Sequence, residues 1–236
     1  MIDKTRCDAE LGQKIFKHLK SKGYLTMETG VFDDYQTRVA KLKQHVSEML
    51  QIMGLDVEDQ QLKETPKRYA KVWVEDSMYG LDWNLFPKCT VFKQEGLTPR
   101  SMVISKNNPI SAVCAHHIER FYGLQGNGKH FDFGPGCTIA YIPKNDRIIG
   151  ISKLSRITEF ASARPCNAEE LTQIIQEILK YVLQTDDVAV YMETFHNCQV
   201  LRGAKANAST VTLACSGIFE SDPQIRAEFL NEARTR

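Results

Sequence analysis

The chain has 236 residues, of which 42% are hydrophobic and 25% are charged, as in an ordinary globular protein. Its formal net charge of +1 at pH 7 gives no indication of a nucleic-acid or acidic-membrane partner. No apolar run approaches the length of a membrane span, and we expect no signal peptide. The seven cysteines form no disulfide-like framework, so we expect a cytoplasmic protein with reduced thiols.

The first third of the chain is predicted to be helical. Residues 1–33 are polar and weakly patterned, and we expect a variable arm with at most one short helix. From residue 34 to about 53, apolar side chains recur at helical spacing, and Gly54 ends that helix. Thr65 and Pro66 are typical of a helix start, and that helix is expected to continue to residue 80. Residues 34–86 are therefore predicted to form a helical region.

Strand-like patterns replace the helical ones in the remaining part of the chain, residues 87–236. Short strands are predicted at residues 90–92, 102–105, 111–114 and 137–142. A glycine-rich loop or long hairpin is predicted between the third and fourth of them, over residues 123–136.

Two helices and two long strands are expected next. The helices are predicted at residues 152–163 and from Asn167 onward, with Glu170 completing a capping box. The strands are predicted at 188–195 and 210–219, and a final helix is expected to begin near Pro223. This order predicts an α+β domain whose sheet is covered by helices on one face.

Cysteines and histidines gather in two short segments, and together they predict a metal site. Cys114 and His117 are three residues apart, so one segment can present both to a single ion. Cys198 can supply a third ligand from a distant strand. Three Cys/His ligands suit a zinc ion that keeps its fourth position for water, as in catalytic sites. His116 and His196 are then candidate proton carriers beside the metal.

Several ordered motifs together resemble the GTP cyclohydrolase I family. They lie at residues 65–71, 79–82, 114–117, 140–143, 149–156, 169–172, 196–198, 202–203 and 210–212. The resemblance covers roughly residues 35–235, which makes it far more specific than one short pattern. It implies the tunnelling fold, whose β-β-α-α-β-β units assemble into an oligomeric barrel. The barrel is usually a homodecamer of two pentamers, with active sites between subunits.

The resemblance also implies a reaction. In this family a zinc enzyme hydrolyses the imidazole ring of GTP at C8, releases formate and yields 7,8-dihydroneopterin triphosphate, the first step of pterin and folate synthesis. By position, Cys114, His117 and Cys198 match the zinc ligands, while His116 and His196 match the histidines that move protons.

A second set of positions matches the residues that bind the nucleotide. Those that hold the triphosphate and act at the ribose are Ser152, Lys153, Arg156 and Arg202, with contributions from Arg68 and Lys71. Glu169 matches the carboxylate that holds the guanine amide edge. A carboxylate can accept hydrogen bonds from both N1–H and N2–H₂ of guanine, whereas adenine lacks that edge. Taken alone, Glu169 could equally be an ordinary acidic residue in the first turn of a helix.

The chain also departs from the family pattern inside the site. Ala115 replaces a glutamate and Ala168 replaces a glutamine, and losing such polar partners at a metal site typically costs about 10–100-fold in affinity or activity. Residues 124–135 form a glycine-rich insertion, expected to be a lid or a contact between subunits.

Three alternatives therefore stay open. The chain could act on a different guanine nucleotide or stop at the ring-opened formamide. It could be a non-catalytic purine- or pterin-binding protein. It could also be a nitrile reductase of the same fold that uses Cys166 as its nucleophile.

Overall fold

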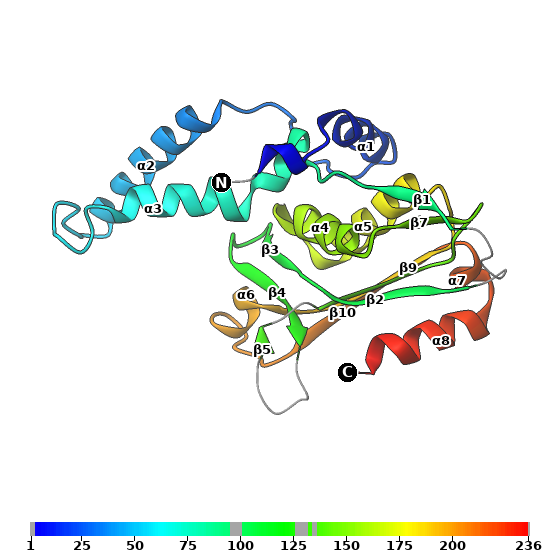
Figure 1. Cartoon of the computed structure of the whole chain (residues 1–236). Coiled ribbons are helices and arrows are strands. Elements are labelled where there is room, and N and C mark those ends of the chain that lie inside the picture. The colour runs from blue at the N-terminus through cyan, green and yellow to red at the C-terminus, as the bar shows by residue number, and fades with distance from the viewer. Residues whose placement is uncertain (1–2, 95–100, 126–131, 134–135, 236) are drawn as a thin grey trace.

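The N-terminal third is helical, as the sequence predicts. The computed structural model describes residues 3–94, 101–125, 132–133 and 136–235. The N-terminal elements are η1 (Lys4–Arg6), α1 (Ala9–Ser21), α2 (Tyr35–Ile52), α3 (Thr65–Lys71), the π-helical turn η2 (Val72–Ser77), η3 (Tyr79–Leu81) and η4 (Trp83–Leu85). Helices α2 and α3 lie side by side and project from the rest of the molecule (Figure 1).

Helix α1 packs closely against the body of the molecule. Ile15 and Leu19 are completely buried in the main core. A Cβ atom on Gly12 would lie 1.9 Å from the carbonyl oxygen of Trp83, so only glycine allows α1 to approach η4 this closely. The helix has 13 residues, longer than the short helix expected in this segment. Its apolar residues Leu11, Ile15 and Leu19 recur every four positions, a signal that the polar residues between them obscured.

Strands of the remaining chain build one large sheet and one small ribbon. The described strands are β1 (Val91–Lys93), β2 (Val103–Asn108), β3 (Ser111–Cys114), β4 (Arg120–Gln125), β5 (Asp132–Phe133), β6 (Cys137–Tyr141), β7 (Arg147–Ile149), β8 (Pro165–Cys166), β9 (Val188–His196) and β10 (Ser209–Cys215). The large sheet has the order β2-β6-β9-β4-β3-β8, with β10 also on β9 and β5 on β4, while β1 pairs with β7. Strands β4 and β5 form part of the expected hairpin, whereas residues 126–131 and 134–135 of the glycine-rich insertion lie outside the described residues.

Strand β9 organises the large sheet. One of its edges pairs with β10 through residues 189–195. Its other edge pairs first with β6, through residues 188–192, and then with β4, through residues 194–196. Because β4 also pairs with β3, the ends of β9 and β3 come close together at one edge of the molecule.

Helices cover both faces of the sheet, and the prediction of one covered face was wrong. Helices α4 (Ile151–Ser162) and α5 (Ala168–Leu183) pack on one face, where they form the main core (Figure 1). Helices α7 (Ile218–Ser221) and α8 (Pro223–Arg234) cover part of the other face. There Phe219 and Phe229 pack against Ala140, Ala189 and Tyr191 in a second, smaller core. Side chains alternate along a strand, so β6 and β9 are buried on both faces.

The predicted strand at 210–219 is shorter than expected. Strand β10 ends at Cys215, and Gly217 turns the chain with a φ of 57°. The Asp187 carboxylate then accepts a hydrogen bond of 2.7 Å from the Ile218 amide, which starts α7. A Cβ on Gly217 would lie 2.2 Å from that carboxylate, so the turn requires glycine. No helix among the described residues is long and apolar enough to cross a membrane.

Candidate metal and catalytic site

Cys114, His117 and Cys198 converge where β3 and β9 end. Cys114 is the last residue of β3, and Cys198 lies in the short helix α6 (Asn197–Val200) that directly follows β9. After Cys114 the chain makes a tight turn, in which the Ile118 amide donates to the Cys114 carbonyl at 2.9 Å. This turn brings His117 back over the strand end, and the donor atoms of the three side chains lie within 4.8 Å of one another.

The donor set fits a zinc ion. Zinc bonds of about 2.3 Å to sulfur and 2.0–2.1 Å to nitrogen place tetrahedral ligand atoms about 3.5–3.8 Å apart, so small side-chain movements complete the site. Burial, followed by the nearby Cys114 thiol, raises the pKa of the Cys198 thiol. Two thiolates at this distance repel each other without a cation, and a bound divalent ion reverses that balance. Three protein ligands leave one coordination position for water or substrate.

Two histidines flank the three ligands in different environments. His116 is exposed, and its Nδ1 lies 3.9 Å from the Cys114 sulfur. His196 is the last residue of β9, and its ring stacks on Phe121 with centroids 4.5 Å apart. Burial lowers the pKa of His196, against the opposing charge of Glu169. The His196 Nδ1 atom is buried and has no hydrogen-bond partner among the described residues, so it is available to a ligand.

A cavity of ≈ 240 Å³ opens beside this cluster. Its lining consists of Cys114, His116, His117, Asn167, Ala168, Glu169, His196, Cys198, Gln199 and Thr210. The first turn of α5 forms one wall and carries the Glu169 carboxylate, while the Asn167 side chain caps the helix by accepting from the Glu170 amide at 2.7 Å. The structure therefore gathers six of the predicted site residues, Cys114, His116, His117, Glu169, His196 and Cys198, around one cavity.

Gln199 and Thr210 line the cavity but were not among the predicted site residues. Gln199 directly follows a predicted ligand, and Thr210 belongs to one of the motifs shared with the family. A sequence pattern marks such neighbours without saying which of them face a ligand. Ala168 also lines the cavity, next to Glu169, and is 1% exposed.

The predicted triphosphate-binding residues do not all join this cavity. Arg202 lies in the turn after α6, close enough for its charge to act on the Cys198 thiol. Ser152, Lys153 and Arg156 instead lie in the first two turns of α4. The last residue of α4, Ser162, contacts Ser111 at the start of β3, and the helix extends away from there for about 15 Å.

The remaining cations lie elsewhere on the chain. Arg156 lines a separate pocket with Arg6 and Glu159. Arg68 and Lys71 are exposed on α3 and do not line the cavity beside the cysteines. One copy of the chain thus holds the three candidate metal ligands and the Glu169 carboxylate together, but separates most of the predicted cations from them.

The fold and the site define an α+β protein with a Cys₂His cluster that could hold a metal ion, at the wall of a cavity that also holds two histidines and a carboxylate. The family model described as GTP cyclohydrolase I matches residues 42–234. Proteins called GTP cyclohydrolase 1 from Shewanella sp. (strain ANA-3) and Serratia proteamaculans (strain 568) are 38% and 37% identical to the chain. They cover 96% and 92% of the chain, which covers 99% and 92% of their own lengths. The protein of the same name from Vibrio cholerae serotype O1 is 39% identical over 82% of the chain and 83% of its own length. The chain belongs to the GTP cyclohydrolase I family.

Proposed function

We propose that the chain is a zinc-dependent GTP cyclohydrolase I that hydrolyses the imidazole ring of GTP at C8, releasing formate and giving 7,8-dihydroneopterin triphosphate. The observation that carries this proposal is the convergence of Cys114, His117 and Cys198 beside a cavity that also exposes His116 and Glu169. Membership of the family supports the choice of GTP as substrate. The nitrile-reductase alternative loses support, because burial raises the pKa of Cys166 to about 12 and keeps that thiol from acting as a nucleophile.

Cys114, His117 and Cys198 are proposed to hold the zinc ion. When bound, zinc supplies the Lewis-acid chemistry that makes a water molecule nucleophilic near neutral pH. Glu169 would accept hydrogen bonds from the guanine N1–H and N2–H₂ groups and so orient C8 toward the metal ligands. Asn167, which caps α5, and Gln199 would complete the wall around the base.

His116 and His196 are proposed to move protons during ring opening. A proton placed on N7 makes C8 electrophilic, and imidazoles suit this work because their usual pKa lies near neutrality. His116 is the more accessible of the two and can exchange protons with solvent. His196 is held by Phe121 with its buried Nδ1 still unpaired within the described chain, so its ring is positioned before the substrate arrives.

We further propose that a neighbouring copy of the chain completes the site. Ser152, Lys153 and Arg156 would then meet the triphosphate and ribose from a second subunit, with Arg68 and Lys71 assisting, while Arg202 acts within the same chain. This arrangement is the homodecameric barrel of tunnelling-fold units expected from the family. In it residues 87–236 form the catalytic unit, 34–86 the helical region and 1–33 the arm.

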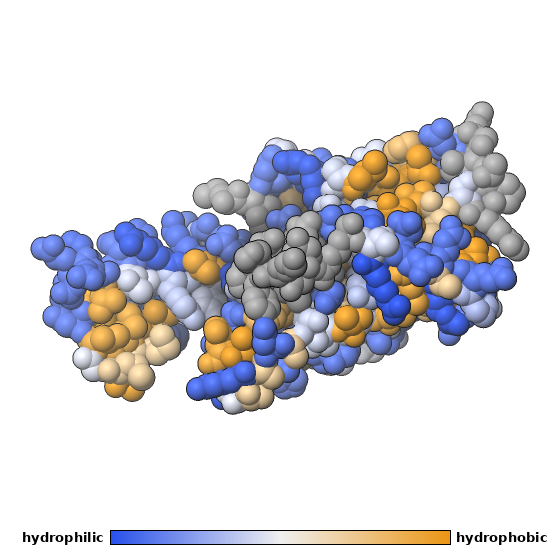
Figure 2. Space-filling view, turned by 90° about the horizontal axis from the view of Figure 1, so that it is seen from below, coloured by the Kyte–Doolittle hydropathy of each residue, from blue (hydrophilic) through white to orange (hydrophobic). Residues whose placement is uncertain are grey.

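Exposed apolar surfaces support such an assembly. The tip of the α2–α3 projection carries Ile52 and Met53, which are 84% and 73% exposed, together with Met49 and Leu55. Figure 2 shows apolar residues gathered at the end of this projection. The outer edge of β10 is free of a strand partner within the described chain, and Val211 and Leu213 are exposed on it. Reduced thiols at the metal cluster are consistent with a cytoplasmic location.

The experiment that tests the proposal couples metal content to turnover. Cys198→Ser should lose both bound zinc and formate release from GTP, because serine is a poor zinc ligand at neutral pH. Cys215→Ser is the matched control, since Cys215 is half-buried on β10 outside the cluster, and it should keep both. Bound zinc is measured by elemental analysis. If Cys198→Ser keeps its zinc and turns over GTP at the full rate, the assignment of the ligands is wrong.

A further inference from the structure

A turn in the N-terminal segment, formed by residues 25–28, contacts both ends of the cavity wall that carries Glu169. The Glu28 amide donates to the Leu25 carbonyl at 3.0 Å, which closes the turn. The Lys20 ammonium donates to the carbonyls of Leu25 and Glu28, each at 2.6 Å, and ties the turn to α1. This segment precedes the residues matched by the family model, yet it reaches the interior of the molecule.

The first contact is a buried ion pair between Glu28 and Arg164. Their side chains are 7% and 1% exposed, and the Arg164 guanidinium lies 2.5 Å from a Glu28 carboxylate oxygen. The other carboxylate oxygen of Glu28 accepts from the Trp83 indole at 3.0 Å. Arg164 also donates to the carbonyls of Ala161 and Gly80, at 2.8 and 2.6 Å. Removing one partner of such a pair leaves an uncompensated buried charge.

The second contact lies six residues further along the chain. The Glu170 carboxylate accepts a hydrogen bond of 3.1 Å from the Leu25 amide. Leu25 is 2% exposed and has a φ of 58°, so its backbone is fixed in a conformation that aims the amide at α5. Glu170 stands next to Glu169 in the first turn of that helix.

The residues between these two contacts form the cavity wall. Cys166 pairs in register with the ligand Cys114, and the Ala115 amide donates to the Cys166 carbonyl at 3.1 Å. The Val113 amide donates to the Arg164 carbonyl at 3.3 Å. Ala168 and Glu169 line the cavity directly. Residues 25–28 therefore contact the cavity wall at two positions, Arg164 and Glu170.

We infer that the turn at residues 25–28 is a brace that positions Glu169 for the guanine base, with Glu28, Arg164 and Glu170 as positioning residues. This inference rests on the proposed function for what Glu169 binds. The brace itself is a property of the chain that can be measured without substrate. It assigns the N-terminal arm a role in substrate binding, although none of its residues lines the cavity.

The test uses the zinc-loaded protein and a matched set of glutamate variants. Glu170→Ala removes the acceptor for the Leu25 amide, whereas Glu170→Gln keeps an oxygen that can accept it. Glu10→Ala is the control in the same N-terminal segment, because Glu10 is an exposed residue whose ion pair among the described residues is with Lys14. Each variant is examined by amide hydrogen exchange and by the KM and kcat for GTP.

In Glu170→Ala we expect faster exchange in residues 113–115 and 165–170 and unchanged exchange in 189–192. We also expect the KM for GTP to rise about tenfold, while kcat stays within about threefold of the parent value. The zinc content should be unchanged, since Glu170 is not one of the candidate metal ligands. Glu170→Gln and Glu10→Ala should behave like the parent. Unchanged exchange and KM in Glu170→Ala, or an equal effect in Glu170→Gln, would overturn the brace.

Glu28→Gln tests the other contact of the brace, the ion pair with Arg164. It should speed exchange in the same two segments, and unchanged exchange there would contradict the inference. If Glu28→Gln does not fold, the comparison of Glu170→Ala with Glu170→Gln decides whether the brace exists. If no variant and no parent sample turns over GTP, the proposed function fails, while the exchange pattern still decides whether residues 25–28 brace the wall.

Discussion

The two histidines beside the metal ligands differ in how firmly the protein holds them. His196 lies at the end of β9 with its ring stacked on Phe121 at an interplanar angle of 12°. His116 lies on the exposed turn after β3, and its described contact is to the Cys114 sulfur. Sequence spacing could predict that both lie near the candidate metal ligands, because His116 directly precedes His117 and His196 is two residues before Cys198. It could not predict their different exposure, which depends on the pairing of β4 with β9.

His116→Ala should keep zinc and lose turnover. The three ligand side chains are unchanged, so metal content should match the parent, whereas loss of a general acid–base group typically costs about 10²–10⁴-fold in rate. Elemental analysis and formate release measure the two effects on one sample. His45→Ala is the control, because His45 is an exposed histidine of α2 near Glu48. Loss of zinc in His116→Ala would show that the ligand and proton-transfer roles have been confused.

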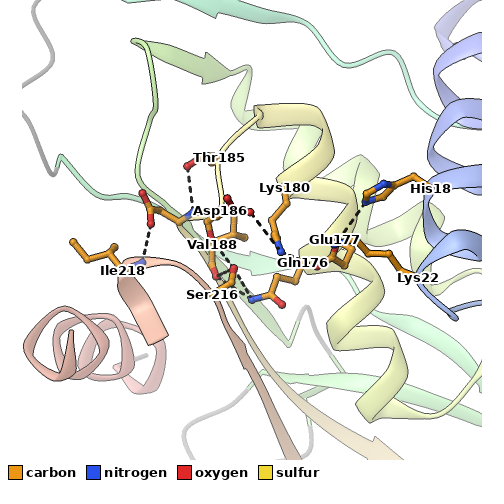
Figure 3. Close-up of polar contacts among 11 residues, drawn as sticks. His18, Lys22, Gln176, Glu177, Lys180, Thr185, Asp186, Val188, Ser216 and Ile218 are labelled. Atoms are coloured by element: carbon orange, nitrogen blue, oxygen red, sulfur yellow. Dashed lines mark hydrogen bonds and ion pairs between the residues drawn. The ribbon is translucent and has the colours of Figure 1, made fainter. Parts of the chain in front are cut away.

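At the scale of elements, helix α5 joins the N-terminal segment to the sheet (Figure 3). Glu177 lies near His18 and Lys22 of the α1 segment, with its carboxylate 3.0 Å from the Lys22 ammonium, and it also pairs with Lys180 at 2.8 Å. Gln176 on the same helix donates to the Val188 carbonyl at 3.0 Å and to Ser216. The helix that carries Glu169 is thus held from both sides.

Glu177→Gln should destabilise the protein in a pH-dependent way. Burial alone raises the pKa of Glu177, but the ammonium groups of Lys180 and Lys22 outweigh it, and the folded pKa lies below the usual 4.5. A lowered folded pKa gives stability that is present above pH 4.5 and lost as the pH falls through the folded value. We expect a loss of about 1–3 kcal/mol in the free energy of unfolding at pH 7, as for a hydrogen bond to a charged group.

Urea unfolding of parent and variant at pH 7, 5 and 3.5 measures this difference. The gap between them should shrink as the pH falls from 4.5 through the folded pKa of Glu177, because protonation then removes the charge that the glutamine variant never carries. Glu10→Gln, at the exposed Lys14 pair, should leave the free energy of unfolding nearly unchanged at every pH. A gap that stays constant across the pH range would show that Glu177 acts through packing rather than charge.

The elements were predicted well where one periodicity runs over many residues. Helices α2 and α5 and strand β9 follow their apolar patterns, and Asn167 caps α5 as expected. Short strands such as β7 and β8 were missed, because two or three residues carry no period. Helix α8 was predicted, but its packing on the second face was not, since that contact depends on the turn at Gly217.

At the scale of the whole molecule, the single chain places half of the predicted site residues around the cavity beside Cys114 and Cys198. A second set, Ser152, Lys153 and Arg156, lies at the start of α4, while Arg202 follows α6 and Arg68 and Lys71 lie on α3. The sequence predicts both sets of residues equally well, because each lies in its own motif. Their separation follows from the direction of α4, which only the packed structure reveals. An assembly in which copies share sites explains why both sets are present.

Complementation between inactive variants tests this sharing. Cys198→Ser and Lys153→Ala should each be inactive alone, but oligomers formed by co-expression should regain roughly one quarter of parent activity. Each proposed site needs intact metal ligands from one subunit and an intact Lys153 from its neighbour. In a random mixture each of these conditions is met with a chance of about one half, so about one quarter of the sites are complete. Co-expressed Cys198→Ser and Cys114→Ser are the control and should stay inactive, because both changes affect the metal side. Mixed oligomers of the first pair without activity would place both sets in one subunit.

We propose that this chain converts GTP to formate and dihydroneopterin triphosphate. To test this, the zinc-loaded protein is incubated with GTP, and the formation of formate and of the pteridine is followed by absorbance and mass spectrometry. We predict both products, in equal amounts and over many turnovers, in spite of Ala115 and Ala168. GTP left intact, or converted only to the ring-opened formamide, would contradict the claim and direct attention to other guanine nucleotides.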